Sequence, residues 1–277
     1  MLNNSGDIIS QGDSGQKSKG NGDDTNKVIL NMIYNPTILT GVSHEMRTHM
    51  NSIVAFSFLM NNHECDEEEK KEFGRHILNS CEKLMGLFDN FLDSAIIDTG
   101  NSKAEPRSCN LDNILDDLLS EFRVLLKRED NEDLVLILEN QAKTQSEIYI
   151  DSNRIARVIR NLFQNALSNT KSGYIKIGYY FREENVTFYV LDSGKGYTKC
   201  REFLQNDNLN EALRMHNDTI SAINLSLAKK LVTIMGGKIW VESNGIEGTG
   251  LYFSIPVDEA GKKNVPITKY NNTRIAI

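Results

Sequence analysis

Seven residues from Leu39 onward recur at alternating steps of three and four, and all but one are apolar. The series is Leu39, Val42, Met46, His49, Ile53, Phe56 and Met60. This spacing is typical of helices that pack along one another, and no proline interrupts residues 37–105. A second series follows at Ile77, Cys81, Leu84, Phe88, Phe91 and Ala95. We expect an antiparallel helical hairpin, and because one hairpin would leave its apolar stripe in water, a homodimeric four-helix bundle.

After Gly100 the pattern changes to mixed helices and strands. Three helices are expected, at 111–126, 152–168 and 221–235, the last stopped by Gly236 and Gly237. Strands are expected at 134–138, 148–150, 174–181, 186–191, 238–243 and 250–256. The order of these elements predicts an α/β sandwich with helices on one face of a mixed sheet.

The length of 277 residues, at roughly 150 residues per domain, predicts two domains. We assign residues 1–27 to a disordered leader, because they are rich in Gly, Ser, Asn and Asp. Residues 28–100 form the helical domain, 101–258 the α/β domain, and 259–277 a linker or tail.

The composition excludes several classes of function. A net charge of −7 argues against nucleic acid as the main partner. No apolar run approaches the roughly 18 residues that span a bilayer, so we expect no membrane contact by this segment. The four cysteines are scattered, which indicates a reducing, cytoplasmic setting. Whether a longer parent protein is anchored in the inner membrane stays open.

His44 lies two residues beyond Val42, which points its side chain away from the seam and into water. An exposed imidazole followed by a carboxylate, here Glu45, suits a phosphoryl acceptor, since the carboxylate can take the ring proton. Thr48 follows one helical turn later on the same face, where its hydroxyl can orient a water. On its own this pattern is weak, because a lone surface histidine is inert in most proteins.

Asn161 and Asn165 are one helical turn apart, and both amides share a face. Amide oxygens are neutral, hard ligands that suit Mg²⁺ when phosphate and water complete its shell. Asp192 follows an expected strand, and its carboxylate can accept a hydrogen bond from the exocyclic amine of adenine. Gly194 and Gly196 let the backbone turn sharply and approach a purine. An ordinary asparagine pair and a strand-end turn are the alternatives.

The run SHEMRTHMNSIVAFS, residues 43–57, resembles the phosphoacceptor box of bacterial sensor histidine kinases. The similarity continues from about residue 38 to 258. It implies that His44 is the phosphoacceptor, Glu45 its acid/base partner and Thr48 a phosphatase-assisting residue. The family has proline where this chain has His49, and we interpret that histidine as a seam residue that sets helix register, rather than as a second phosphosite.

The α/β half resembles the ATP-binding domain of the same kinases, which is shared with gyrase-type ATPases. The resemblance implies ATP and Mg²⁺ as cofactors, with Asn165 as the Mg²⁺ ligand beside Asn161. Asp192, Gly194 and Gly196 would bind the adenine end, and Thr249 would support Asp192. Residues 28–100 are then the dimerisation and histidine phosphotransfer domain, and 101–258 the catalytic domain.

Several positions depart from the family pattern. Ser168 replaces a frequent lysine, and Ala222 and Asn224 replace two glycines of the glycine box. If those positions need a positive φ, each replacement costs on the order of 1 kcal/mol. The stretch 199–218, which would form the lid over ATP, contains no glycine.

The function implied by the resemblance is a homodimeric kinase core that phosphorylates His44 from Mg-ATP and relays the phosphoryl group to a response-regulator aspartate. The alternative is a degenerate kinase that acts as a phosphatase or dimeric scaffold and binds ATP weakly. A gyrase-type ATPase clamp ranks last, because it has no use for the His44 motif. Residues 274–277 resemble the first strand of a receiver domain, which suggests a fragment of a hybrid kinase; a disordered tail is an equal alternative.

Overall fold

The computed structural model describes residues 36–62, 65–98, 102–128, 133–140, 147–196, 204, 219–242 and 248–257. The predicted leader and the predicted tail lie outside these residues. So does the predicted lid at 199–218, except for Leu204. Among the described helices, none is both long and apolar enough to cross a bilayer.

The predicted hairpin consists of α2 (Pro36–Asn62) and α3 (Glu67–Asp98). Asp66 caps α3, because its side chain accepts the backbone N–H groups of Glu68 (2.9 Å) and Glu69 (2.8 Å). Glu69 reciprocates by accepting the N–H of Asp66 at 3.1 Å, which completes a capping box. Inside the hairpin the Phe56 ring stacks on His76, with 4.5 Å between ring centroids.

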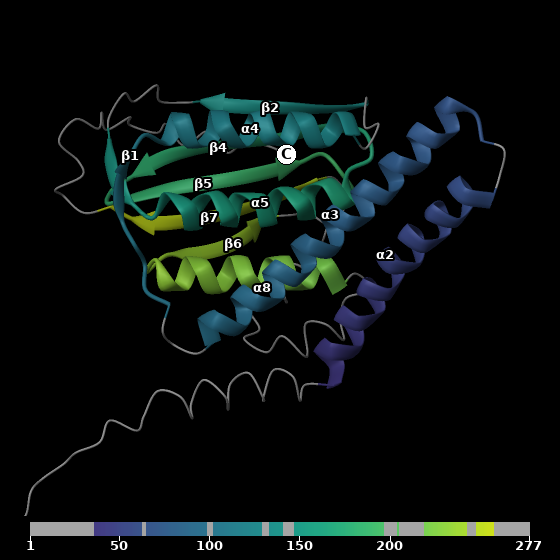
Figure 1. Cartoon of the computed structure of the whole chain (residues 1–277). Coiled ribbons are helices and arrows are strands. Elements are labelled where there is room, and N and C mark those ends of the chain that lie inside the picture. The colour runs from purple at the N-terminus through teal and green to yellow at the C-terminus, as the bar shows by residue number, and fades with distance from the viewer. Residues whose placement is uncertain are drawn as a thin grey trace, which may run out of the picture.

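The α/β domain holds a five-stranded mixed sheet in the order β2-β4-β5-β7-β6 (Figure 1). Its strands are β2 (Leu134–Asn140), β4 (Gly173–Arg182), β5 (Asn185–Asp192), β6 (Lys238–Glu242) and β7 (Thr249–Pro256). Only β2 and β4 pair in parallel. A short strand that the sequence did not predict, β1 (Arg107–Cys109), pairs antiparallel with β3 (Ile148–Ile150).

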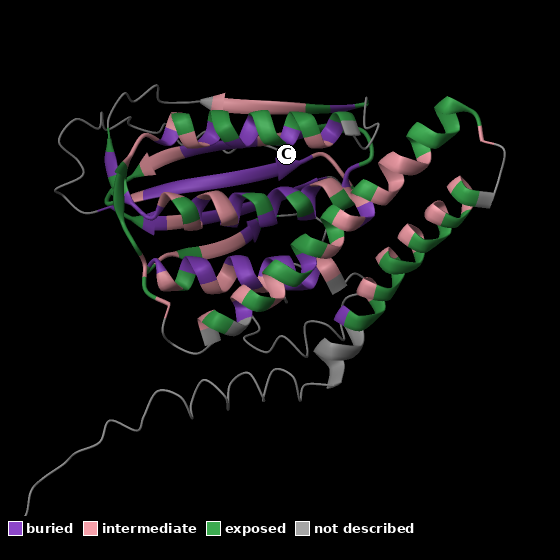
Figure 2. Cartoon of the chain, viewed as in Figure 1, coloured by how far each residue is buried: buried purple, intermediate pink, exposed green. Residues whose placement is uncertain are grey.

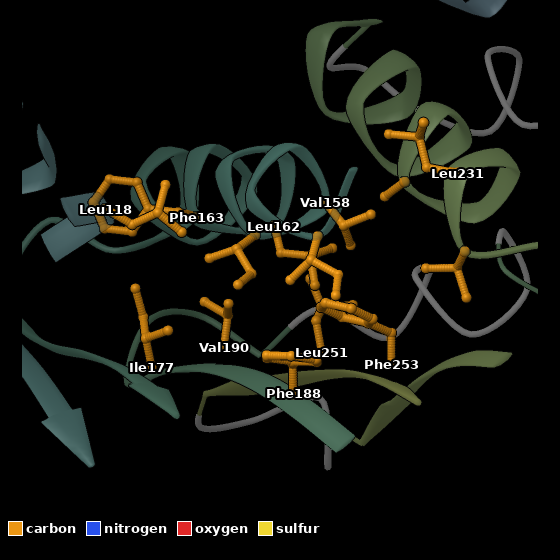
Figure 3. Packing of buried hydrophobic residues seen from close by; sticks show 14 of the residues in the cluster. Leu118, Val158, Leu162, Phe163, Ile177, Phe188, Val190, Leu231, Leu251 and Phe253 are labelled. Carbon is orange, nitrogen blue, oxygen red and sulfur yellow. The ribbon is translucent and has the colours of Figure 1, made fainter. Parts of the chain in front are cut away.

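Three helices lie on one face of the large sheet, as predicted: α4 (Leu111–Arg128), α5 (Ser152–Asn169) and α8 (Thr219–Ile234). Side chains from these helices and from the sheet meet in a continuous apolar core (Figure 3). Phe122 and Phe163 stack at 3.8 Å between ring centroids, and Phe188 and Phe253 at 4.9 Å. Gly236 follows α8 with φ 72°, the left-handed conformation that ends a helix.

The hairpin packs against α8, and its two buried apolar residues, Val42 and Leu87, are continuous with the core of the α/β domain. Apart from the buried polar residues Ser80 and Ser94, Figure 2 shows the other described side chains of the hairpin as exposed or half-buried. The second predicted seam is wrong at Phe88, which is 48% exposed, whereas the preceding residue, Leu87, is 4% exposed. The reason is that this part of α3 faces α8 as well as α2.

Candidate functional site

A carboxylate cap fixes the start of α5, the helix that carries the two asparagines. The Asp151 side chain accepts the backbone N–H groups of Arg154 at 3.0 Å and of Glu105 at 2.8 Å. The cap satisfies donors that the first turn leaves free and ties the helix to the segment before β1. The orientation of α5 is therefore set at its first residue.

Asn161 and Asn165 are both inside the protein, with exposed fractions of 4% and 1%. Neither Nδ2 nor Oδ1 of Asn165 has a hydrogen-bond partner among the described residues, and Nδ2 of Asn161 also lacks one. A buried amide without a partner costs free energy, so such groups mark a place where a ligand or ion completes the bonding. The burial also rules out an ordinary surface asparagine pair.

Asp192 ends β5 and is 3% exposed. Burial raises the pKa of its carboxyl to about 6, while the backbone N–H of Gly194, which donates to Oδ1 at 2.9 Å, opposes that rise. Thr249 is its cross-strand partner on β7 and is also buried, at 2% exposed. The strand-end position predicted for Asp192 is confirmed.

Gly194 packs directly on the end of α5. A Cβ added there would lie 2.4 Å from the carbonyl oxygen of Asn169 and 2.6 Å from the hydroxyl of Thr170, so no larger residue fits without movement. Its carbonyl accepts the N–H of Gly248 at 2.8 Å. The structure thus places Asp192, Gly194 and Thr249 at the C-terminal end of α5, the helix that carries Asn161 and Asn165. Gly196 follows two residues after Gly194 and is half-buried.

The two replacements of the glycine box lie within the regular helix α8. Ala222 is fully buried and Asn224 is 5% exposed. Among the described non-glycine residues only Glu183 has a positive φ, so neither Ala222 nor Asn224 carries the backbone strain that a left-handed conformation would impose.

His44 is separate from this cluster. Its side chain is 75% exposed, which confirms that it points to solvent, and its Nδ1 lies 3.9 Å from Oε1 of Glu45. The Thr48 hydroxyl donates to the backbone carbonyl of His44 at 3.0 Å. These partners of His44 all lie on α2.

Comparison with known families agrees with both halves of this arrangement. Residues 37–100 match the family described as His Kinase A (phospho-acceptor) domain, and residues 150–259 match the Histidine kinase-, DNA gyrase B-, and HSP90-like ATPase family. The chain contains the catalytic core of a sensor histidine kinase. The second match assigns ATP binding to the α/β domain of this core.

Curated relatives support the same conclusion, and a solved structure shares the fold. The autoinducer 2 sensor kinase/phosphatase LuxQ of Vibrio vulnificus is 27% identical over 233 residues, which cover 80% of this chain and 26% of LuxQ. The hybrid signal transduction histidine kinase K of Dictyostelium discoideum is 29% identical, with 80% of this chain and 19% of the relative covered. Histidine kinase ThkA, solved in complex with response regulator protein TrrA, shares the fold at a TM-score of 0.60 and 22% identity, covering 85% of this chain and 66% of ThkA. The chain spans about a quarter or less of these curated relatives.

The residues of the kinase core fit a magnesium ion that is shared with a nucleotide. The described residues contain no cluster of three or more His, Cys, Asp or Glu side chains that would hold a metal alone. Mg²⁺ commonly takes one or two protein oxygens and completes its shell with water and substrate phosphates. The unpartnered, buried Oδ1 of Asn165 is a suitable protein ligand of that kind.

Two polar features of this core were not predicted from the sequence. Thr170, which ends α5, has a buried hydroxyl beside Gly194. Asn90 on α3 donates to Oδ1 of Asn224 at 2.8 Å and to Oδ1 of Asn161 at 3.4 Å. Asn90 lies between the seam positions Phe88 and Phe91, next to Asp89, and no sequence signal distinguishes it from an ordinary polar residue of a helix.

His49, which replaces the family's proline, lies half-buried in α2, and its buried Nε2 has no partner within the part of the chain that the structure describes. Burial lowers the pKa of His49, the charge of Lys83 on α3 lowers it further, and Glu45 opposes both. The ring therefore favours the neutral form, as expected of a residue held between two helices.

Proposed function

We propose that this chain is an autophosphorylating histidine kinase core in which Mg-ATP, bound in the α/β domain, donates its γ-phosphoryl group to His44. The observation that carries the proposal is the buried amide of Asn165, whose donor and acceptor both lack partners among the described residues. An unpaired amide in a protein interior costs free energy, and a polar ligand that bonds to it would remove that cost.

In this proposal the adenine end of ATP lies against Asp192, whose carboxylate accepts a hydrogen bond from the exocyclic amine. Gly194 and Gly196 permit the close approach of the purine, and Thr249 supports the carboxylate from the adjacent strand. Asn165, with Asn161 one turn before it, holds the magnesium end. Mg²⁺ when bound neutralises charge on the phosphate oxygens, which lowers the barrier to transfer.

The transfer step uses the exposed position of His44. Because Nδ1 is the nitrogen nearest Glu45, the lone pair of Nε2 is free to attack the γ-phosphorus. A P–N bond forms while the bond between that phosphorus and the β–γ bridging oxygen breaks, and ADP leaves with the electron pair. Glu45 then accepts the proton that the charged ring releases from Nδ1.

The test is incubation with γ-labelled ATP. We expect an acid-labile, alkali-stable label on the wild type and none on His44→Gln. His76→Gln is the matched control, because His76 also lies in the hairpin, 40% exposed, and has no proposed role. An unlabelled wild type under varied metal and salt, or a label that survives in His44→Gln, contradicts the proposal.

The proposed partners are a second copy of this chain and a response-regulator receiver domain. A row of exposed apolar residues on α2, Met50, Val54 and Phe58, repeats every four residues and provides a face for a four-helix bundle. The ThkA–TrrA complex and the hybrid kinase among the relatives support a receiver as the next acceptor, in the same parent chain or in a separate one. In this proposal the segment works in the cytoplasm.

A second candidate, a phosphatase or scaffold that binds ATP weakly, is favoured by the first turns of α8. Ala222 and Asn224 place buried side chains where the family has none, and the Asn224 amide is already bonded to α3. In this mode Thr48 orients the water that hydrolyses a receiver phosphate. Nucleotide titration separates the two: micromolar, Mg²⁺-dependent ATP binding favours the kinase, and none at millimolar ATP favours the second candidate.

A further inference from the structure

Three polar residues near the end of α3 tie that helix to the two helices of the nucleotide site. Figure 1 shows α3 crossing α5 and α8. Asn90 donates to Asn161 and Asn224, as described above. Asp93 forms an ion pair with Arg157 of α5. Ser94 accepts a hydrogen bond from Nζ of Lys230 of α8 at 2.8 Å.

The groups that make these contacts are buried or half-buried. Asn161, Asn224 and Ser94 are exposed by 4%, 5% and 4%, respectively. Burial lowers the pKa of Arg157, against the opposing charge of Asp89. Polar contacts in such an environment are directional and are costly to break one partner at a time, so they define one docked position of α3.

The docked position uses a group that the nucleotide site needs. Asn90 Nδ2 engages Oδ1 of Asn161, the neighbour of the proposed Mg²⁺ ligand Asn165. It also holds Asn224 in the second turn of α8, at a position where the family's glycine offers no side-chain acceptor. The contact to Asn224 is thus a consequence of the altered glycine box.

We propose that Asn90 is a latch that holds α3 on the nucleotide site and competes with Mg-ATP for it, an inference that rests on the proposed kinase function. With the latch closed, Asn161 is engaged by α3. Binding of Mg-ATP requires the Asn90 amide to leave Asn161 and Asn224. Opening the latch also frees the α/β domain from α3, which lets it move relative to α2.

The first test is the affinity of the full chain for ATP with Mg²⁺, measured by calorimetry. Asn90→Ala removes the competing amide, and we expect about three- to tenfold tighter binding, the size of one buried hydrogen bond. Asn224→Ala should act in the same direction, and the double variant should bind no tighter than the stronger single variant. Asn79→Ala, on the same helix and without these contacts, is the matched control and should bind like the wild type. Weaker binding by Asn90→Ala, or binding equal to that of Asn79→Ala, overturns the latch.

A charge exchange tests the same docking through another pair. Asp93→Arg places two cations in contact and should open the latch, with ATP affinity rising as in Asn90→Ala. Adding Arg157→Asp restores opposite charges and should return the affinity toward that of the wild type. A double variant that stays as open as Asp93→Arg alone contradicts a docked α3.

Hydrogen exchange without nucleotide separates failure of the latch from failure of the kinase proposal. Asn90→Ala should raise amide exchange several-fold in 219–234, and Asn79→Ala should not. If no variant binds ATP, the proposed kinase function fails, and with it the competition; the docking is then judged by this exchange alone. Equal exchange in Asn90→Ala and Asn79→Ala overturns the docking as well.

Discussion

The hairpin and the α/β domain differ in how completely they bury their apolar side chains. The α/β domain has a dry core of its own, with residues such as Ile155, Leu162 and Phe163 fully buried. Among the described large apolar residues of the hairpin, only Val42 and Leu87 are buried, and both belong to the core that is continuous with the α/β domain. Of the twelve large apolar side chains that are exposed in the described residues, eight lie on α2 and α3. One region completes its fold within a single chain, and the other presents a surface for a partner.

The largest effect is expected from a cavity in the core of the α/β domain, which tests whether that core alone stabilises the domain. Phe163→Ala removes a ring that is 0% exposed and stacked on Phe122. We expect the free energy of unfolding of the α/β domain to fall by about 3–5 kcal/mol. Phe58→Ala on α2 removes the same ring at 61% exposure and should leave this denaturant transition unchanged. Equal losses in the two variants would contradict the contrast.

The second prediction concerns the exposed row on the hairpin. Val54 is 66% exposed in the single chain, and the proposed dimer buries it. A glutamate at this position would place an unpaired charge in the dimer interface. Val54→Glu should weaken the homodimer about 100-fold, as measured by sedimentation equilibrium. Val124→Glu is the matched control, since Val124 is 52% exposed on α4 of the α/β domain. A wild type that is monomeric at all concentrations would remove the basis of the dimer proposal.

The elements with regular periodicity could be predicted from the sequence. The seven-residue seam predicted α2, and alternation predicted β4, β5 and β7 within one or two residues at either end. Local spacing also placed Asn161 beside Asn165, because a helix brings residues four apart onto one face. The strand β1 is three residues long and has no period to detect.

What the sequence could not show depends on contacts between distant segments. Asn90 meets Asn224 across 134 positions of the chain, and no local pattern encodes that pair. The burial of Asn165 and Asp192 is likewise a product of packing, since both residues are usually exposed. Ala222 and Asn224 looked strained from the family pattern, but a regular helix accommodates both without strain.

The third prediction uses the buried carboxyl of the α/β domain. Because the pKa of Asp192 is raised to about 6, the folded state favours the protonated carboxyl more than the unfolded state does. The resulting contribution to the free energy of unfolding is fully present below about pH 4 and is lost as the pH rises through 6. Asp192→Asn should therefore be more stable than the wild type by about 2 kcal/mol at pH 7.5 without nucleotide, and the gain should shrink toward pH 4. A gain that is constant with pH contradicts the assignment to Asp192.

The hairpin should respond to acid in the opposite sense, with the smallest effect. The pKa of His49 is lowered by burial and then by Lys83, so the folded state favours the neutral ring, and its contribution is lost as the pH falls below about 6.5. His49→Leu removes the buried, unpartnered Nε2, and we expect a gain of about 1 kcal/mol at pH 7.5 in the hairpin transition. That gain should grow as the pH falls to 5, whereas the gain from Asp192→Asn shrinks over the same range. Thermal unfolding of both variants and the wild type at several pH values measures the two slopes. If the gains of the two variants changed with pH in the same direction, either Asp192 or His49 would not titrate as its surroundings require.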